Sequence, residues 1–345
     1  MISIDNIPLT PFKGGVYKKF SIIVPVYNRP DEVSELLQSL SKQTFTDFEL
    51  VLVEDGSTKP CVQEAEKYRL FFPIQYISKE NTGRSDSRNV GMYHAKGDYF
   101  IFFDSDCIIP PQYLETVDSL LKEVDCYGGP DRELASFSHM QKAINYAMTS
   151  FWTTGGIRGG KKKTGRFEPR TFNMGFSRTV YETVGVFKNM FGEDIELSNR
   201  IRNAGFTIEL FPDAFVYHKR RVNLKKFFKQ VHIFGQARIN VFKIYPNSLR
   251  VVHTLPAFAV IIGFLILILA FCGMPWLLFF PVIYFLLLFL DALVKSNNIR
   301  IACLSLLASL IQISGYGFGF IFSFIKKVIL KQRLESDEKI KKIYK

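Results

Sequence analysis

Two aspartates separated by one residue, Asp104 and Asp106, are the first candidates for chemistry in this chain. They follow Tyr99–Phe103, an apolar and aromatic run that is too short for a helix and therefore predicts a strand buried on both faces. Carboxylates at i and i+2 at the end of such a strand can reach one hard cation, and a magnesium-type ion held by them keeps positions for substrate phosphates. The alternative is that both aspartates only end the strand and begin a turn.

Three earlier segments are also short, apolar and bounded by turn residues, and so predict strands. They are Phe20–Asn28, Phe48–Val53 and Ile74–Ile77. Glu54, Asp55 and Gly56 directly follow the second of these, and a polar loop and helix start at residues 81–91 follow the third. Singly, such residues are explained as turn formers. Their repetition predicts a shared site, because ligands bind at the carboxyl ends of strands in open α/β sheets.

Helices are expected between these strands. Asp31 could cap one whose apolar residues fall on a single face: Val33, Leu36, Leu37 and Leu40. Alternating strands and helices predict a mostly parallel sheet. Further on, we expect strands at 170–178 and 206–211 and a helix at 193–205.

Five blocks in this order resemble the family 2 glycosyltransferases of the GT-A fold. The blocks are Ile23–Asn28, Gln43–Thr58, Asn81-x-Gly83, Arg88-Asn89-x-Gly91 and Gly97–Asp106. The resemblance covers roughly residues 20–245, and several ordered blocks are more specific than any single motif. It implies an N-terminal extension at 1–19 and a catalytic domain at 20–222 with a Rossmann-like, mostly parallel sheet.

The resemblance also implies roles for individual residues. Nucleotide-sugar contacts are expected from Pro25, Tyr27, Glu54, Asp55, Asn81, Gly83, Arg88, Asp104 and Ser105. Pro25 and Asp55 would line the base pocket, although Glu54 stands where many relatives have Asp, so either acid could touch the base. Asp104 and Asp106 would bind Mg²⁺ or Mn²⁺, with His218 as a further metal ligand.

The Glu193-Asp194 pair opens a predicted helix, where acidic residues are favoured by the helix dipole. Capping alone would explain them. Transfer of a sugar to a hydroxyl group, however, needs a group that accepts the hydroxyl proton, and a carboxylate meets that need. The resemblance points to Asp194 as this base.

Residues 251–330 are almost wholly apolar and predict membrane helices. Segments 255–271 and 276–294 would form a hairpin, followed by a third apolar segment at 301–325 and a basic tail at 331–345. An amphipathic interfacial helix is expected at 223–250. Basic clusters on both sides, such as Arg220, Arg221 and Lys326, belong on the cytosolic side, so an even number of crossings is favoured. The third segment is therefore expected to be re-entrant or interfacial, with three spans as the alternative.

The N-terminus, Met1–Asp5, lacks the features of a signal peptide, and the five cysteines form no metal or disulfide pattern. We therefore expect a multi-pass protein of the inner membrane with its catalytic domain on the cytoplasmic face. The net charge of +12 fits anionic lipid, since no nucleic-acid-binding motif is present. The loop at 155–166, rich in glycine and cations, is either a solvated loop or a contact for an anionic acceptor or the membrane surface.

The resulting hypothesis is an inverting, metal-dependent glycosyltransferase. It would move a sugar from a nucleotide-diphosphate donor, with UDP expected, to a lipid-linked or growing glycan of the cell surface. The alternatives are a polyprenyl-phosphate glycosyltransferase and a catalytically silent membrane protein that only binds nucleotide.

Overall fold

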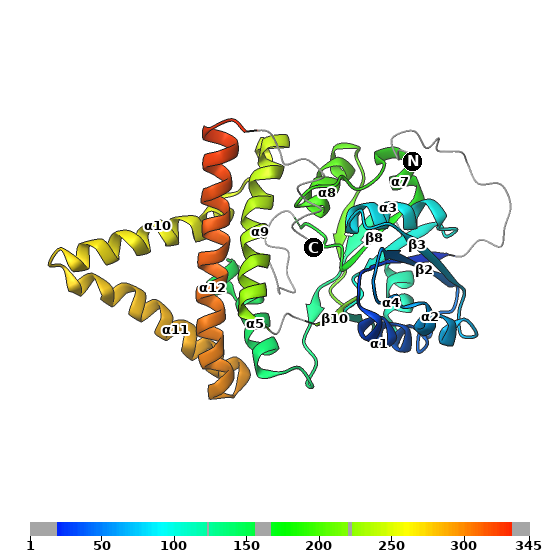
Figure 1. Cartoon of the computed structure of the whole chain (residues 1–345), viewed down its shortest axis with the longest axis horizontal. Helices are drawn as coiled ribbons and strands as arrows, with labels where there is room; N and C mark the ends of the chain where they lie inside the picture. The colour runs from blue at the N-terminus through cyan, green and yellow to red at the C-terminus, as the bar shows by residue number, and fades with distance from the viewer. Residues whose placement is uncertain (1–18, 123, 156–166, 220–222, 333–345) are drawn as a thin grey trace. The chain divides into compact units, whose positions relative to one another are not determined.

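The computed structural model describes residues 19–122, 124–155, 167–219 and 223–332 (Figure 1). Four predicted features lie outside the described residues: the N-terminal extension up to residue 18, the cationic loop at 156–166, Arg220 with Arg221, and the tail from residue 333. The chain divides into two compact units, each of which is described separately. We call them the sheet unit (Met1–Gly129, Pro169–Lys188 and Leu197–Ala214) and the helical unit (Pro130–Glu168, Asn189–Glu196 and Phe215–Lys345).

The sheet unit is built on a seven-stranded sheet with the order β3-β2-β1-β4-β8-β6-β9. Its strands are β1 (Phe20–Val26), β2 (Phe48–Asp55), β3 (Ile74–Lys79), β4 (Tyr99–Phe103), β6 (Cys126–Gly128), β8 (Asn173–Ser177) and β9 (Ile208–Leu210). β1, β2, β3 and β4 are parallel, as are β6 and β9, whereas β8 runs antiparallel to both of its neighbours. The predicted mostly parallel sheet is confirmed, with β8 inserted against the common direction. A two-residue strand, β5 (Cys107–Ile108), follows β4.

Helices cover both faces of this sheet. They are α1 (Pro30–Leu40), α2 (Val62–Tyr68), α3 (Arg84–His94), α4 (Tyr113–Leu120) and α7 (Arg178–Val184). Figure 1 shows α3 and α7 on one face and α1, α2 and α4 on the other. On the α3 and α7 face, Met92 and Val180 join Phe100, Phe102 and Phe176 in one buried cluster. Burial on both faces explains why the central strands are nearly continuous apolar runs.

The start of α1 differs from the prediction. The helix begins at Pro30, with Arg29 at the N-cap position, so Asp31 is not the cap. Proline is favoured at the first helical position because its fixed φ suits the helix and its missing N–H would have no partner there. Asp31 instead lies in the first turn beside Glu32, where negative charge interacts favourably with the helix dipole.

The helical unit contains most of the remaining helices. They are α5 (His139–Thr149), α6 (Phe151–Thr154), α9 (Leu224–Ile244), α10 (Val251–Phe271), α11 (Phe279–Ser296) and α12 (Ile299–Phe324), which continues into a π-helical turn at Ile325–Ile329. Two short strands, β7 (Asp131–Arg132) and β10 (Val216–His218), pair in parallel within the same unit. α8 (Glu193–Asn203) begins in the helical unit and continues into the sheet unit.

Asparagine side chains fix the starts of two long helices. The Asn223 side chain accepts hydrogen bonds from the backbone N–H groups of Lys225 and Lys226 at the start of α9. Asn298 accepts equivalent bonds from Arg300 and Ile301 at the start of α12. Each cap satisfies donors that have no partner inside the helix, so both helices begin at defined residues.

α9 and α12 lie side by side at very short range (Figure 1). A Cβ atom on Gly235 of α9 would overlap the carbonyl oxygen of Tyr316, and one on Gly319 of α12 would overlap the carbonyl oxygen of His232. Gly317 faces α10 instead, where an added Cβ would lie 2.6 Å from the carbonyl oxygen of Pro256. Small residues that let two helix backbones approach are typical of helix pairs in membranes, and here they bring α12 against both α9 and α10.

α5 and α6 are attached to the apolar hairpin formed by α10 and α11. The Tyr146 hydroxyl of α5 lies 2.6 Å from Asp291 Oδ2 and 3.1 Å from the Leu288 carbonyl oxygen, both on α11. Asp291 also pairs with Lys295 at 2.8 Å. The Tyr284 hydroxyl donates a 2.6 Å hydrogen bond to the Trp152 carbonyl of α6. Thus the one acid that the sequence places inside the apolar block has polar partners.

Among the residues that the structure describes, three helices are long and apolar enough to cross a membrane: Val251–Phe271, Pro275–Ser296 and Ile299–Ile329. The apolar window of the third is 44% buried inside the structure, against 6% and 11% for the other two. α12 is also continuous from Ile299 to Phe324, which argues against a broken re-entrant segment. Whether it spans the membrane or lies at the interface stays a prediction, as do the domain boundaries drawn from the sequence.

We expect Gly235→Ala and Gly319→Ala each to lower the free energy of unfolding by about 1–3 kcal/mol, because the new methyl group must push apart backbone atoms of α9 and α12. Thermal unfolding of the purified full chain in detergent measures this effect. Gly263→Ala on α10 is the matched control, since nothing lies within 4 Å of its added Cβ. Equal stability of all three variants would show that the close approach of the two helices is not required.

Candidate functional site

The sheet brings the predicted strand ends to one edge. Pro25 lies beside Val53 in the register of β1 and β2, and Ile23 lies beside Phe102 in the register of β1 and β4. Because these strands are parallel, their carboxyl ends share one edge of the sheet. The predicted residues at this edge are Pro25, Tyr27, Glu54, Asp55, Asp104, Ser105 and Asp106. The common edge confirms that these strand ends meet, while the roles of the residues stay predictions.

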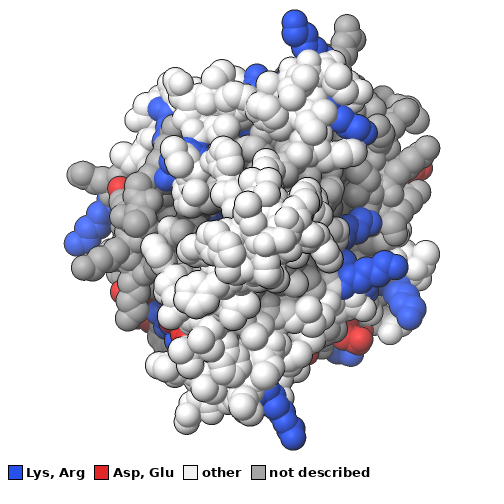
Figure 2. Space-filling view, turned by 90° about the vertical axis from the view of Figure 1, so that its left-hand side faces the viewer, with Lys and Arg blue, Asp and Glu red and all other residues white. Residues whose placement is uncertain are grey.

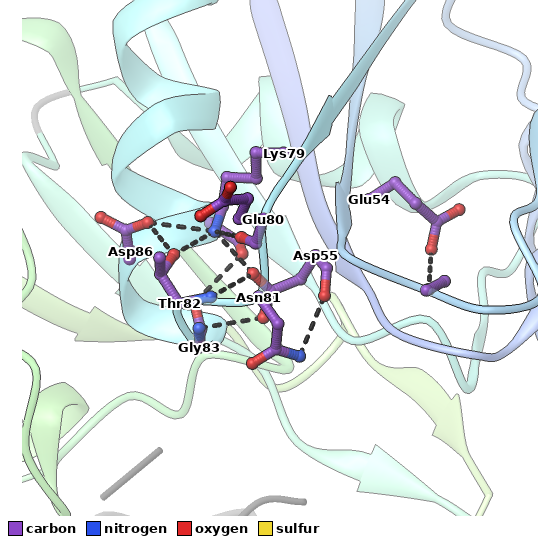
Figure 3. A network of polar contacts seen from close by, with 10 residues as sticks. Glu54, Asp55, Lys79, Glu80, Asn81, Thr82, Gly83 and Asp86 are labelled. Atoms are coloured by element: carbon purple, nitrogen blue, oxygen red, sulfur yellow. Dashed lines mark hydrogen bonds and ion pairs between the residues drawn. The ribbon is translucent and has the colours of Figure 1, made fainter. Parts of the chain in front are cut away.

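Asp55 is almost fully buried, and its carboxylate accepts bonds from three donors (Figure 3). The backbone N–H groups of Thr82 and Gly83 donate to Oδ1 and Oδ2, each over 2.9 Å. Lys79 Nζ forms an ion pair with Oδ1 at 2.5 Å. The Asn81 side chain donates to the Asp55 backbone carbonyl over 2.9 Å. Asn81 and Gly83, both predicted as nucleotide contacts, therefore hold the Asp55 segment directly.

An ionised carboxylate has about four acceptor positions. Three donors therefore leave Asp55 with one further position, on Oδ2. Gly56, which follows, has a φ of +67°, and an added Cβ would lie 2.6 Å from the Asn81 backbone nitrogen. Glycine is thus required where the loop after β2 passes the loop that carries Asn81.

Lys79 is a site residue that the sequence analysis did not identify. It ends β3 and lies beside Asp55 in the strand register. Its ammonium group also forms an ion pair with Asp86 Oδ2 at 3.0 Å and a hydrogen bond with the Thr82 hydroxyl, which in turn bonds Asp86. The available signal was its place two residues after the predicted strand Ile74–Ile77 and two residues before Asn81. A single lysine in that place carries no distinctive pattern, however.

Glu54 points away from this network (Figure 3). Its carboxylate is 1% exposed and has four partners in its own surroundings. Oε1 accepts from the Ser57 hydroxyl, Oε2 accepts from the Cys61 backbone N–H at 2.8 Å and the Tyr76 hydroxyl at 3.0 Å, and the Cys61 thiol forms a further side-chain hydrogen bond with Glu54. Burial, and then the Glu54 charge, raise the pKa of Tyr76 above its usual range, so the hydroxyl remains a donor. The geometry therefore favours Asp55 over Glu54 as the acid available to a base.

Asn28 ties the loop after β1 to the loop after β2. Its φ is +53°, a conformation that asparagine tolerates better than most residues. Its backbone N–H donates to the Ser57 hydroxyl over 2.7 Å, and its side-chain oxygen accepts from the Lys59 N–H over 2.9 Å. The sequence suggested only that Asn28 ends a strand, whereas the structure gives it a role in holding the two loops together.

Arg88 and Asp104 form an ion pair at the same edge. Arg88 Nη2 lies 2.8 Å from Asp104 Oδ1, and the Arg88 side chain is 1% exposed while that of Asp104 is 36% exposed. The pair thus joins a buried cation on α3 to the first carboxylate after β4. A buried arginine in this geometry fixes the direction of its partner's carboxylate, because moving the carboxylate would leave the buried charge without that bond.

The residues after β4 fit a divalent cation. Asp104, Ser105 and Asp106 are partly exposed, whereas Phe103 before them and Cys107 after them are buried. Two carboxylates supply the oxygen ligands that Mg²⁺ and Mn²⁺ prefer. Since Arg88 bonds to Oδ1 of Asp104, that residue keeps a second oxygen for a ligand. The donor set therefore suits the cation that the sequence predicts.

Asp194 and His218 belong to the helical unit. Asp194 is the second residue of α8 and is partly exposed, and its Oδ1 accepts the Ile195 backbone N–H over 2.8 Å. The neighbouring acids Glu193 and Glu196 are only 2% and 0% exposed. His218 ends β10 and is partly exposed.

Comparison with known proteins finds similarity to glycosyltransferases. Residues 21–185 match the family model described as glycosyl transferase family 2. A 104-residue stretch is 42% identical to an uncharacterized glycosyltransferase of Haemophilus influenzae, covering 30% of this chain and 34% of that protein. A 109-residue stretch is 39% identical to the poly(ribitol-phosphate) beta-N-acetylglucosaminyltransferase TarS of Staphylococcus aureus, covering 30% of this chain and 19% of TarS. The chain thus spans about a third or less of these two relatives.

Two longer similarities extend beyond this stretch. Glycosyltransferase AglE of Haloferax volcanii is 26% identical over 253 residues, which cover 71% of this chain and 81% of AglE. The mannosyltransferase PcManGT from Pyrobaculum calidifontis, solved in complex with GDP-Man and Mn²⁺, aligns with a TM-score of 0.55 over 94% of this chain and 92% of that one. Sequence identity in that alignment is 15%, so the likeness concerns the fold.

Glu54→Gln is expected to lower the free energy of unfolding by about 1–3 kcal/mol, because an amide nitrogen would then face a donor in place of an acceptor oxygen. Chemical unfolding compared with wild type measures the loss, and Glu80→Gln, at an exposed position, is the control. Unchanged stability of Glu54→Gln would show that this carboxylate is not needed to hold the β2 loop.

Proposed function

We propose that the protein is an inverting glycosyltransferase that uses a nucleoside-diphosphate sugar, on the premise that residues 21–185 match the glycosyl transferase family 2 model. The fold expected from the resemblance, a GT-A type α/β sheet followed by apolar helices, is confirmed. The observation that carries the proposal is the edge of this sheet, where Asp55, Asp104 and Asp106 lie with the Arg88–Asp104 ion pair.

Asp55 is the residue we assign to the nucleobase. Its carboxylate keeps one acceptor position, which suits a base that presents a single N–H group between two carbonyl groups. Uracil has this pattern. Guanine presents neighbouring N–H and NH₂ donors, which would be better matched by a carboxylate with both oxygens available. The donor is accordingly a UDP-sugar, with Pro25 and Tyr27 lining the same pocket.

Arg88, Asp104, Ser105 and Asp106 are assigned to the ribose and the diphosphate. Asp104 and Asp106 would hold Mg²⁺ or Mn²⁺, and PcManGT, which shares the fold, was solved with Mn²⁺. When bound, such an ion neutralises charge on the diphosphate leaving group. Arg88 keeps the Asp104 carboxylate directed through its 2.8 Å ion pair. His218 stands as a further candidate ligand.

Asp194 is the proposed base. It takes the proton from the acceptor hydroxyl as the bond between that oxygen and the anomeric carbon forms and the bond to the diphosphate oxygen breaks. One displacement of this kind inverts the anomeric carbon. The partial exposure of Asp194 beside buried Glu193 and Glu196 supports the choice, since an acceptor can reach only an exposed carboxylate.

The acceptor we propose is a lipid-linked or growing glycan at the cytoplasmic face of the inner membrane. α10 and α11 expose large apolar side chains, including Phe258, Ile262, Phe280 and Leu286. Figure 2 shows a face that is largely free of charged residues, as expected of a surface that enters lipid. In this proposal the apolar helices anchor the enzyme beside its acceptor.

Asp194→Asn should lower the transfer rate by about 10²- to 10⁴-fold while leaving donor binding intact, because only the acceptor proton depends on it. Asp106→Asn should remove turnover as well, whereas Asp213→Asn, at an exposed position, should behave as wild type. Release of nucleoside diphosphate from a panel of UDP- and GDP-sugars, with and without lipid-linked acceptors, measures both effects.

Full activity of the Asp106 and Asp194 variants would refute the proposed roles of Asp106 as a metal ligand and Asp194 as the base. Transfer to polyprenyl phosphate alone would instead support a polyprenyl-phosphate glycosyltransferase. Nucleotide binding without turnover would support a catalytically silent membrane protein.

Removal of divalent cations should stop transfer, and Mg²⁺ or Mn²⁺ should restore it. Asp104→Asn should then need a higher metal concentration for half-maximal activity, because one carboxylate ligand is lost. Titration of activity against added metal after treatment with a chelator gives this value for each variant. Undiminished transfer in the chelator would contradict the assignment of Asp104 and Asp106 as metal ligands.

A further inference from the structure

The segment that carries Asp194 packs on α9. Phe191, 1% exposed, forms a small buried cluster with Ala237 and Ile233. Gly192 has a φ of +89°, and a Cβ there would lie 3.2 Å from Val241 and 3.3 Å from Ala237. The chain therefore enters α8 along the surface of α9, in a conformation that favours glycine.

Two polar contacts add to this packing. The Asn240 side-chain amide, 4% exposed, donates to the Phe191 carbonyl oxygen at 3.5 Å. The Tyr245 hydroxyl donates to Glu196 Oε1 over 3.3 Å. Phe191 and Glu196 lie on either side of Asp194 in the chain, so Asn240 of α9 and Tyr245, which directly follows α9, contact the chain before and after this acid.

Asn240 also bonds to the end of α12. Its side-chain oxygen accepts a 2.7 Å hydrogen bond from Lys327 Nζ, and Lys327 is only 5% exposed. Lys327 lies in the π-helical turn at Ile325–Ile329, and such turns often occur at functional sites. Burial of an ammonium group is costly, so the position of this lysine depends on its hydrogen bonds. One asparagine thus joins α9, α12 and the segment before Asp194.

We propose that Asn240 and Lys327 are positioning residues for Asp194, an inference that rests on the proposed function. Through them the apolar helix α12 sets where the base-bearing segment lies. A displacement of the base by about 1 Å costs about 100-fold in rate, so loss of either contact slows chemistry without touching the donor site.

The test uses the full chain in lipid nanodiscs. Asn240→Ala and Lys327→Met should lower kcat about 10- to 100-fold and leave the donor KM unchanged. Lys327→Arg should restore much of kcat, because a guanidinium group can still donate to the Asn240 oxygen. Hydrogen exchange of the amides in 191–196 should become faster in the first two variants. Tyr146→Phe is the matched control, since it loses the hydroxyl contacts with Asp291 and the Leu288 carbonyl in the same unit and has no contact with 191–196 among those described.

Three other results would overturn the inference. Wild-type kcat in Asn240→Ala and Lys327→Met, with Asp194→Asn inactive, would overturn this inference and leave the proposed function standing. Full activity of Asp194→Asn would overturn both. A fall in kcat with an equal loss of donor binding, or faster exchange throughout α9 and α12 without rescue by Lys327→Arg, would show a general packing role and also overturn the inference.

Discussion

The parallel pairing of β1, β2 and β4 is the constraint on which the candidate site depends. Backbone hydrogen bonds fix the register, so that Val26 lies beside Glu54 and Ile23 beside Phe102. Once these pairs form, the residues that end each strand can only meet at one edge of the sheet. The apolar runs are buried on both faces, and a slip by one residue would turn every side chain to the other face. Packing of the core thus places the polar residues.

Because successive side chains of β2 point to opposite faces of the sheet, two neighbouring acids have different roles. Glu54 faces the Ser57 and Tyr76 hydroxyls and holds the following loop, whereas Asp55 faces the backbone N–H groups of Thr82 and Gly83. Successive side chains of a strand point to opposite faces, so the two carboxylates cannot serve one pocket together. The Glu54 carboxylate is therefore structural, whereas the Asp55 carboxylate is the one that we propose for a ligand.

The sequence predicted this sheet and its edge because both depend on local patterns. Apolar runs ending in acids show in the chain itself, and β1 to β4 lie where those runs lie. Lys79 and the α9–α12 contact could not be predicted in this way. Lys79 matters only because β3 pairs with β2, and Gly235 and Gly319 matter only because two helices distant in the chain meet. Asp31 is not the cap because the helix begins at Pro30 with Arg29 at the N-cap position, two residues before Asp31.

The division into two units gives the helical part more than an anchoring role. The segment 189–196 lies between stretches of the sheet unit in the chain, yet it packs with the C-terminal helices. Residues assigned to the donor are fixed by strand pairing, whereas the proposed base is fixed by α9, whose position follows from close contact with α12. Interior packing is dense and transmits small displacements, so a shift of α12 must reach the base-bearing segment. Under the proposed function, the donor would be bound through one set of contacts and the acceptor hydroxyl activated through another. Changes in the apolar helices should therefore act on transfer before they act on donor binding.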